Sequence, residues 1–181
     1  MLLSAKDSLL LIVDAQEKLL PAIHQRDVVT SRMRWLGEIA MQLDLPILIT
    51  EQYPKGLGYT VDSLQDIIEA ARVVEKTHFS ALRDDTFRDV LSEYKKKHVV
   101  IMGMETHVCV LQTAIELQAS GYQVFLPADT VGSRRPTDKD SAIERMRNAG
   151  VEIITSEMAA FEWLEKSGTD TFRNISRNWL K

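Results

Sequence analysis

The chain contains 181 residues, of which 45% are hydrophobic and 27% are charged. This length suits one folded domain, and this composition is typical of globular proteins rather than disordered or membrane-embedded ones. The formal net charge of −4 argues against a nucleic-acid partner, because phosphate recognition needs a concentrated basic surface. We therefore expect a single domain over residues 1–181, with no nucleic acid and no membrane among its partners.

The cysteine content and the N-terminal segment bear on the cellular compartment. Cys109 is the only cysteine, so no internal disulfide can form and the fold does not depend on an oxidising environment. The first apolar run, residues 9–13, is preceded by charged residues and is too short for a signal peptide or a membrane-spanning helix. These features predict a cytoplasmic location.

Two alternating sequence patterns indicate βαβ units: short apolar runs rich in branched residues, and longer stretches of helical period. The apolar runs predict six parallel strands, at residues 8–13, 46–50, 72–75, 98–102, 123–126 and 152–155. Helices are predicted at residues 28–43, 64–71, 87–96, 106–119, 139–148 and 158–165. Right-handed crossovers favour a doubly wound three-layer α/β sandwich, and the chain is too short for an eight-stranded barrel.

Three chemically reactive residues follow predicted strands. Asp14 comes directly after the first strand, Lys76 directly after the third, and Cys109 a short way past the fourth, where Gly103 would begin a tight turn. Because ligands bind beyond the carboxyl ends of parallel strands, these residues fall at the edge where a site is expected. Taken singly, such an aspartate caps a turn, such a lysine is solvated and a lone cysteine is a small buried hydrophobe.

Together the three residues form a chemically coherent set. A thiol needs a base or a cation nearby to react as a thiolate, and here Asp14 could accept the proton while Lys76 stabilises the charge. The helix that follows would add its dipole and backbone N–H donors for an oxyanion. We expect the Lys76 charge and this dipole to depress the pKa of Cys109, with the Asp14 carboxylate acting in the opposite direction.

Four sequence blocks resemble those of the isochorismatase-like hydrolases, in the same order along the chain. The resemblance extends from about residue 9 to residue 155, and the blocks are LLIVDAQ at residues 10–16, TEQYPKGLG at 50–58, EKTHFS at 75–80 and GMETHVCV at 103–110. The second block most resembles the subgroup called isochorismatase-domain-containing proteins. Each block supplies a residue that this family uses.

The resemblance implies a six-stranded parallel sheet, for which we predict the strand order 3-2-1-4-5-6. It also implies an Asp-Lys-Cys catalytic triad, which maps onto Asp14, Lys76 and Cys109. A cis peptide bond between Met104 and Glu105 is implied as well, with the backbone N–H groups of Glu105 and Cys109 forming an oxyanion hole. Related proteins are commonly dimers or larger assemblies, so we expect a homo-oligomer.

Departures from the family pattern reduce the number of reactions and substrates expected for this chain. The isochorismate-cleaving branch lacks the cysteine, so Cys109 favours attack on an amide, a ureide or a similar carbonyl group. The nicotinamidase branch carries a metal site made of an aspartate and two histidines after the second strand. The corresponding loop here, residues 51–62, contains no histidine. We therefore predict no metal and no cofactor, and we disfavour nicotinamide as the substrate.

The residues around the predicted triad have less specific roles. His78 and His107 could in principle join Asp14 and Glu105 around a metal, but their spacing specifies no metal site, and local hydrogen bonding or pocket lining is the favoured interpretation. By position, the predicted walls of a substrate pocket are Leu19, Gln52, Tyr53 and Phe79.

The leading functional prediction is a cysteine-nucleophile hydrolase that acts on a small carbonyl compound through a covalent thioester. The alternative is a non-catalytic oligomeric binding or scaffold protein that retains the fold. The tail from Phe161 to Leu180 holds many large apolar residues. These residues could pack on their own domain or across a subunit interface.

Overall fold

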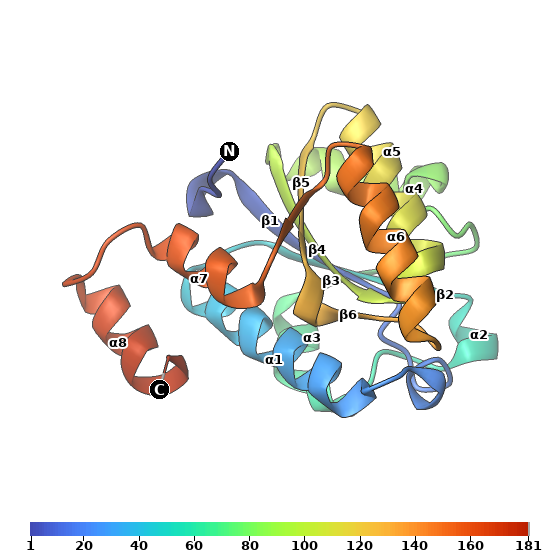
Figure 1. Cartoon of the computed structure of the whole chain (residues 1–181), viewed down its shortest axis with the longest axis horizontal. Helices are drawn as coiled ribbons and strands as arrows, with labels where there is room; N and C mark the ends of the chain where they lie inside the picture. Colours follow the sequence, from blue (N-terminus) through green and yellow to red (C-terminus); the bar gives the residue numbers. More distant parts are fainter. Residues whose placement is uncertain (181) are drawn as a thin grey trace.

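A central parallel sheet is covered by helices on both faces in the computed structural model of the chain, which describes residues 1–180 (Figure 1). Its strands are β1 (Ser8–Val13), β2 (Ile47–Gln52), β3 (Arg72–Lys76), β4 (His98–Met104), β5 (Gln123–Pro127), β6 (Val131–Gly132) and β7 (Glu152–Ile154). The helices are α1 (Arg26–Gln42), α2 (Pro54–Leu57), α3 (Gln65–Ala70), α4 (Asp85–Glu93), α5 (Leu111–Ala119), α6 (Pro136–Asn148), α7 (Ser156–Leu164) and α8 (Asp170–Trp179). A π-helical turn, Thr106–Val110, precedes α5.

The layers follow from the right-handed crossovers. Helix α1 contacts both α3 and α7 on one face of the sheet, while α5 and α6 pack together on the other, where α4 also lies (Figure 1). The sheet order is β3-β2-β1-β4-β5-β7, which confirms the doubly wound fold class. The predicted count of six strands is wrong by one, because the two-residue strand β6 pairs with the end of β4 and the predicted sixth strand is β7.

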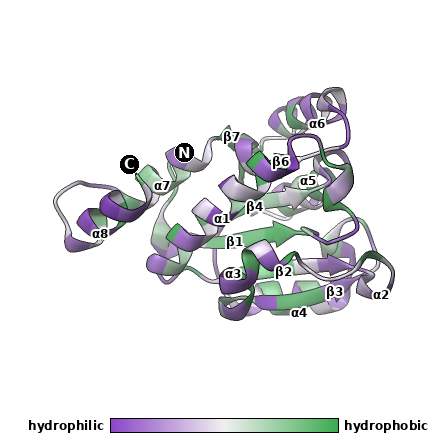
Figure 2. Cartoon of the chain, turned by 90° about the horizontal axis from the view of Figure 1, so that it is seen from below, coloured by the Kyte–Doolittle hydropathy of each residue, from purple (hydrophilic) through white to green (hydrophobic). Residues whose placement is uncertain are grey.

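Hydrophobic burial explains the central strands. Every residue of β1 and of β4 is buried, and the central part of the sheet is hydrophobic along its length in Figure 2. Such continuous burial is expected where helices cover both faces of a parallel sheet. The pairing register places Val13 of β1 level with Thr50 of β2 and Gly103 of β4. The carboxyl ends of these three strands therefore lie side by side.

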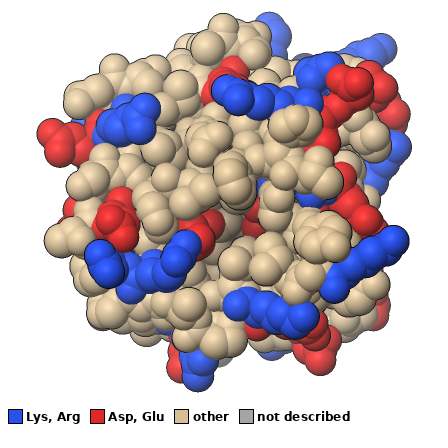
Figure 3. Space-filling view, turned by 90° about the vertical axis from the view of Figure 1, so that its right-hand side faces the viewer, with Lys and Arg blue, Asp and Glu red and all other residues tan. Residues whose placement is uncertain are grey.

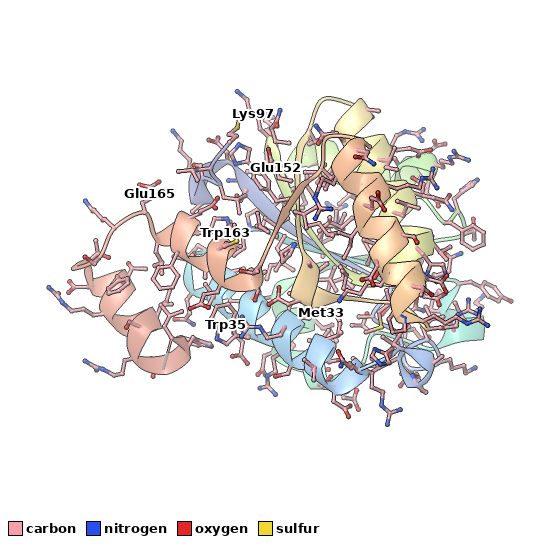
Figure 4. The ribbon with its side chains drawn as sticks, in the orientation of Figure 1. Met33, Trp35, Lys97, Glu152, Trp163 and Glu165 are labelled. Atoms are coloured by element: carbon pink, nitrogen blue, oxygen red, sulfur yellow. The ribbon has the colours of Figure 1, made fainter. Side chains whose placement is uncertain are left out.

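The apolar tail packs against its own chain. Helix α8 lies against α1 at the end of the molecule opposite the carboxyl edge of the sheet (Figure 1). The Trp35 indole donates a hydrogen bond of 2.8 Å to the Trp179 carbonyl, the Trp179 indole donates one of 2.7 Å to Glu38, and Ile175 is fully buried. Figure 4 shows Trp35 on the part of α1 nearest α8. Within residues 1–180, no helix combines the length and the apolar character needed to cross a bilayer.

Candidate active site

Asp14, Lys76 and Cys109 all lie at the carboxyl edge of the sheet. Asp14 directly follows β1, Lys76 is the last residue of β3, and Cys109 belongs to the π-helical turn after β4. Figure 3 looks onto this end of the molecule, where a largely uncharged centre is surrounded by acidic and basic side chains. Asp14, Lys76 and Cys109 are all buried, and electrostatic interactions are stronger there than in bulk water.

Asp14 is fully buried, and its carboxylate is held from two sides. The Thr50 hydroxyl donates a hydrogen bond of 2.7 Å to Oδ1, and Lys76 Nζ donates one of 2.7 Å to Oδ2. The backbone of Asp14 has a φ of +51°, a left-handed conformation that aspartate tolerates better than most residues. This conformation turns the chain at the strand end, while the Asp14 N–H still bonds to the Thr50 carbonyl at 3.0 Å.

The Lys76 ammonium is surrounded by oxygen acceptors. Besides Asp14, its Nζ donates to Gln52 Oε1 at 2.6 Å and to the backbone carbonyls of His78 and Phe79 at 3.2 and 3.4 Å. Its side chain has no exposed surface. A buried charge is stable only when it is paired and hydrogen-bonded, and Lys76 meets both conditions.

Cys109 is buried, with 6% of its surface exposed, and it lies close enough to Asp14 and Lys76 for both groups to shift the pKa of its thiol. The structure therefore brings the three predicted residues together. The expectation of a depressed thiol pKa is wrong: burial and the Asp14 carboxylate raise the pKa of Cys109, and the opposing effect of Lys76 is smaller. Burial also raises the pKa of Asp14, against the hydrogen bonds and the charge that stabilise its carboxylate.

The turn that carries Cys109 begins at Gly103. This residue has a φ of +129°, and a Cβ atom there would lie 2.0 Å from the Val13 carbonyl oxygen, so only glycine fits. In the same turn, the peptide bond between Met104 and Glu105 is cis. The Glu105 carboxylate forms a two-point ion pair with Arg134, with Nε–Oε1 and Nη2–Oε2 distances of 2.5 and 3.1 Å.

The predicted pocket residues occupy different places. Gln52 belongs to the Lys76 network, and its side-chain amide donates to the Thr77 carbonyl at 2.7 Å. Tyr53 and Phe79 are more than half exposed, and Leu19 is half-buried at the start of a 3-10 turn. Tyr53 also lines a cavity of about 210 Å³ that Lys76 borders.

The two histidines near the site contact different partners and not each other. His78 Nδ1 lies 3.2 Å from the Asp84 carboxylate, and His107 Nδ1 lies 3.0 Å from the Ser133 hydroxyl. In the part of the chain from residue 1 to 180, no group of three or more His, Cys, Asp or Glu side chains is arranged to hold a metal ion.

Sequence reasoning missed two residues that support the site. Thr50 ends the apolar run of β2 and hydrogen-bonds to Asp14, so its position beside the first strand could have indicated it. The Gln16 side chain donates to the carbonyls of Gln52 and Gly58 and accepts from the Gln52 N–H at 2.7 Å. It links the loop after β1 to the loop after β2, and no local pattern signals this contact.

A doubly wound parallel sheet with a buried carboxylate, ammonium and thiol at its carboxyl edge is typical of α/β enzymes. Residues 8–158 match the Isochorismatase domain, so the chain belongs to the isochorismatase family. Membership of this family supports a hydrolase function.

Three similar proteins illustrate the match. Isochorismatase family protein 1A from Dictyostelium discoideum is 36% identical over 177 residues, which cover 96% of this chain and 86% of that protein. The structure of MAR1 ribonuclease from Caenorhabditis elegans is 34% identical, with a TM-score of 0.92 over 100% of this chain and 93% of that one. The YcaC gene product from Escherichia coli, described as an octameric hydrolase of unknown specificity, is 25% identical, with a TM-score of 0.92 over 99% and 91%.

Proposed function

We propose that the protein is a cysteine-nucleophile hydrolase that cleaves a C–N bond in a small amide, ureide or related carbonyl compound. The observation that carries this proposal is the buried contact of Cys109 with Asp14 and Lys76 at the edge where α/β proteins bind ligands. Taken together, the three groups supply a nucleophile, a base and a cation, which nucleophilic catalysis requires.

The raised pKa values of Cys109 and Asp14 indicate how the nucleophile is activated. Because the pKa of Cys109 is raised, the resting enzyme at neutral pH holds a thiol rather than a thiolate. Asp14 then has to accept the thiol proton while the sulfur attacks, as a general base. A raised pKa makes the Asp14 carboxylate a stronger base than a solvated aspartate. Lys76 balances the negative charge of whichever group is ionised.

The reaction proceeds in two halves. The Cys109 sulfur bonds to the carbonyl carbon, its proton passes to Asp14, and the negatively charged carbonyl oxygen accepts hydrogen bonds from the N–H groups of Glu105 and Cys109. The C–N bond then breaks and the leaving nitrogen takes the proton from Asp14, which leaves a thioester on Cys109. Water, deprotonated by Asp14, attacks the thioester carbon. The C–S bond breaks and the sulfur takes the proton back from Asp14, which releases a carboxylic acid and restores the thiol. Each step uses only water and groups of this chain, so the proposed mechanism includes no metal and no cofactor.

The proposed partners are a small-molecule substrate and further copies of the chain. The octameric state given for YcaC supports a homo-oligomer. The C. elegans relative is named a ribonuclease, but the net charge of −4 favours a small molecule over RNA here. We further propose a cytoplasmic location, because Cys109 has no disulfide partner in the chain.

The test is a screen of small amides and ureides against the wild-type protein and Cys109→Ala, with intact-mass detection of an acyl adduct during turnover. We expect turnover and a transient adduct in the wild type and neither in Cys109→Ala. Full activity of Cys109→Ala would overturn the mechanism. A wild-type protein that forms no adduct and turns over no compound would favour the non-catalytic scaffold.

A further inference from the structure

The segment from the end of β6 to Arg134 contacts the end of β4 and the nucleophile turn at three successive positions. Gly132 of β6 pairs with Met104 at the end of β4. The Ser133 hydroxyl then lies 3.0 Å from His107 Nδ1, and the Arg134 guanidinium binds the Glu105 carboxylate. The segment from residue 132 to 134 therefore lies alongside the turn that supplies Cys109 and both proposed oxyanion donors.

The contact between Arg134 and Glu105 is the strongest of the three. Two parallel bonds, of 2.5 and 3.1 Å, fix both the distance and the plane of the carboxylate, which a single-point contact would leave free to rotate. The Glu105 side chain is only 10% exposed, whereas that of Arg134 is 61% exposed. Glu105 therefore depends on Arg134 for its charge partner, because water reaches its carboxylate poorly.

The loop itself is anchored independently of the nucleophile turn. The Ser133 carbonyl accepts a hydrogen bond of 3.0 Å from the His24 N–H, and Ser133 is 2% exposed. A Cβ atom on Gly132 would lie 2.5 Å from the Ile23 side chain, so the loop is closely packed against the segment before α1. A fixed loop can hold the turn in place, whereas a mobile one could only follow it.

We propose that Arg134 is a positioning residue for the oxyanion hole. By holding the Glu105 side chain, it fixes the orientation of the Glu105 backbone N–H, which donates a hydrogen bond to the oxyanion that develops on the carbonyl oxygen. This inference rests on the proposed function, but it concerns a different part of the site from the contact between Asp14 and Lys76. Loss of Arg134 should therefore slow steps that form an oxyanion and spare steps that do not.

Two probes of Cys109 separate these kinds of step. With p-nitrophenyl acetate, the sulfur bonds to the acetyl carbon, an oxyanion forms, and the C–O bond breaks to give a thioester and p-nitrophenolate, while the thiol proton is lost through Asp14. With iodoacetamide, the sulfur displaces iodide from a saturated carbon, and no oxyanion forms. Both labels are counted by intact mass, and Cys109→Ala shows whether they are on Cys109.

We expect Arg134→Met to slow acylation about 10- to 100-fold, the range expected when a catalytic group is displaced by a fraction of an ångström to one ångström. Its rate of alkylation should stay within about twofold of the wild type. Arg134→Lys, which keeps the charge but not the paired geometry, should recover part of the acylation rate. The control is Arg135→Met, because Arg135 is adjacent and exposed, and its side chain has no ion pair within residues 1–180.

Other outcomes would overturn the inference. If Arg134→Met acylates at the wild-type rate, or if both probes slow equally in it, Arg134 is not a positioning residue for the oxyanion. If Arg134→Met does not fold, Glu105→Gln removes the charge of the same pair and is expected to show the same selective loss of acylation. If acylation and alkylation of Glu105→Gln are both as fast as in the wild type, or both slowed equally, the result would count against the inference. A wild-type protein whose Cys109 is not acylated at all would overturn the proposed function, and this inference with it.

Discussion

Lys76 Nζ lies 2.7 Å from the Asp14 carboxylate, and neither side chain has any exposed surface. An ion pair in this position is costly to form, because both charges leave water, and it is therefore weak support for stability by itself. Removing one partner is a different matter, since the other is left as an unpaired buried charge. The pair fits a site that must keep a carboxylate ionised beside a thiol.

Lys76→Met is expected to destabilise the protein by about 3–5 kcal/mol, the usual cost of stranding one member of a buried pair. Urea unfolding measures this change. Lys55→Met is the matched control, because Lys55 is exposed and has no ion pair in the described part of the chain, and it should stay within about 0.5 kcal/mol of the wild type. Equal stability of the two variants would show that the charge of Asp14 is not maintained in the folded state.

The raised pKa of Cys109 leads to a prediction about how the rate of alkylation depends on pH. Because the thiolate is the reactive form, the rate of alkylation by iodoacetamide in the wild type should still be rising at pH values above about 8.5, the range of an ordinary thiol. The rate is followed by intact mass across a pH series. A profile that levels off below that range would show a depressed pKa and would contradict the burial argument.

Asp14→Asn tests the cause of that shift. The Asp14 carboxylate raises the pKa of Cys109, so its removal should move the alkylation profile to lower pH and increase the rate at pH 8. Turnover of any substrate found should nevertheless fall sharply, because the general base is lost. A variant that alkylates more slowly than the wild type would contradict this assignment of the charge effect.

Gly103→Ala tests the close approach of β4 to β1. The added Cβ would meet the Val13 carbonyl oxygen at 2.0 Å in a left-handed backbone conformation, so we expect a loss of more than about 4 kcal/mol or no folding. Gly121→Ala provides the comparison: Gly121 also has a positive φ, of +92°, but no atom lies within 4 Å of its added Cβ. That variant should lose only about 1–2 kcal/mol, from backbone strain. Thermal unfolding compares the two, and similar losses would show that strain rather than contact restricts Gly103.

The triad residues that the sequence predicted share one property: each lies at the end of a strand, directly after it, or in the turn that follows it. A charged residue that stops an apolar run, as Asp14 does after β1, has its place in a parallel sheet fixed by the run itself. Lys76 is instead the last residue of β3, a strand in which only Val74 and Lys76 are buried. Cys109 was selected by its position after the fourth predicted strand, and the four-block resemblance supported that choice. The direction of its pKa could not be predicted, because burial depends on the packing of the whole turn.

Strand β6 and helix α8 are among the elements that escaped prediction, for different reasons. β6 has two residues, too few to show any periodicity, and it forms only because β4 extends to Met104. Helix α8 did carry a signal, since Phe172, Ile175 and Trp179 are spaced to lie on one face of a helix. The pairing of Glu105 with Arg134 joins residues far apart in the chain, and only the folded sheet brings them together.

Thr50→Val removes the hydroxyl that bonds to Asp14 Oδ1 at 2.7 Å while nearly preserving the side-chain shape. Because a hydrogen bond to a charged group contributes about 1.5–3 kcal/mol, we expect a loss of stability in that range. That bond also lowers the pKa of Asp14, so its removal should raise this pKa further. The general base must be ionised to act, and the acidic limb of the kcat/KM profile should therefore shift to higher pH in the variant.

Thr30→Val is the control: the Thr30 hydroxyl donates to the Arg26 carbonyl within α1, away from the site, and its loss should leave the pH profile unchanged. An acidic limb that does not move in Thr50→Val would show that a group other than Asp14 limits the rate at low pH.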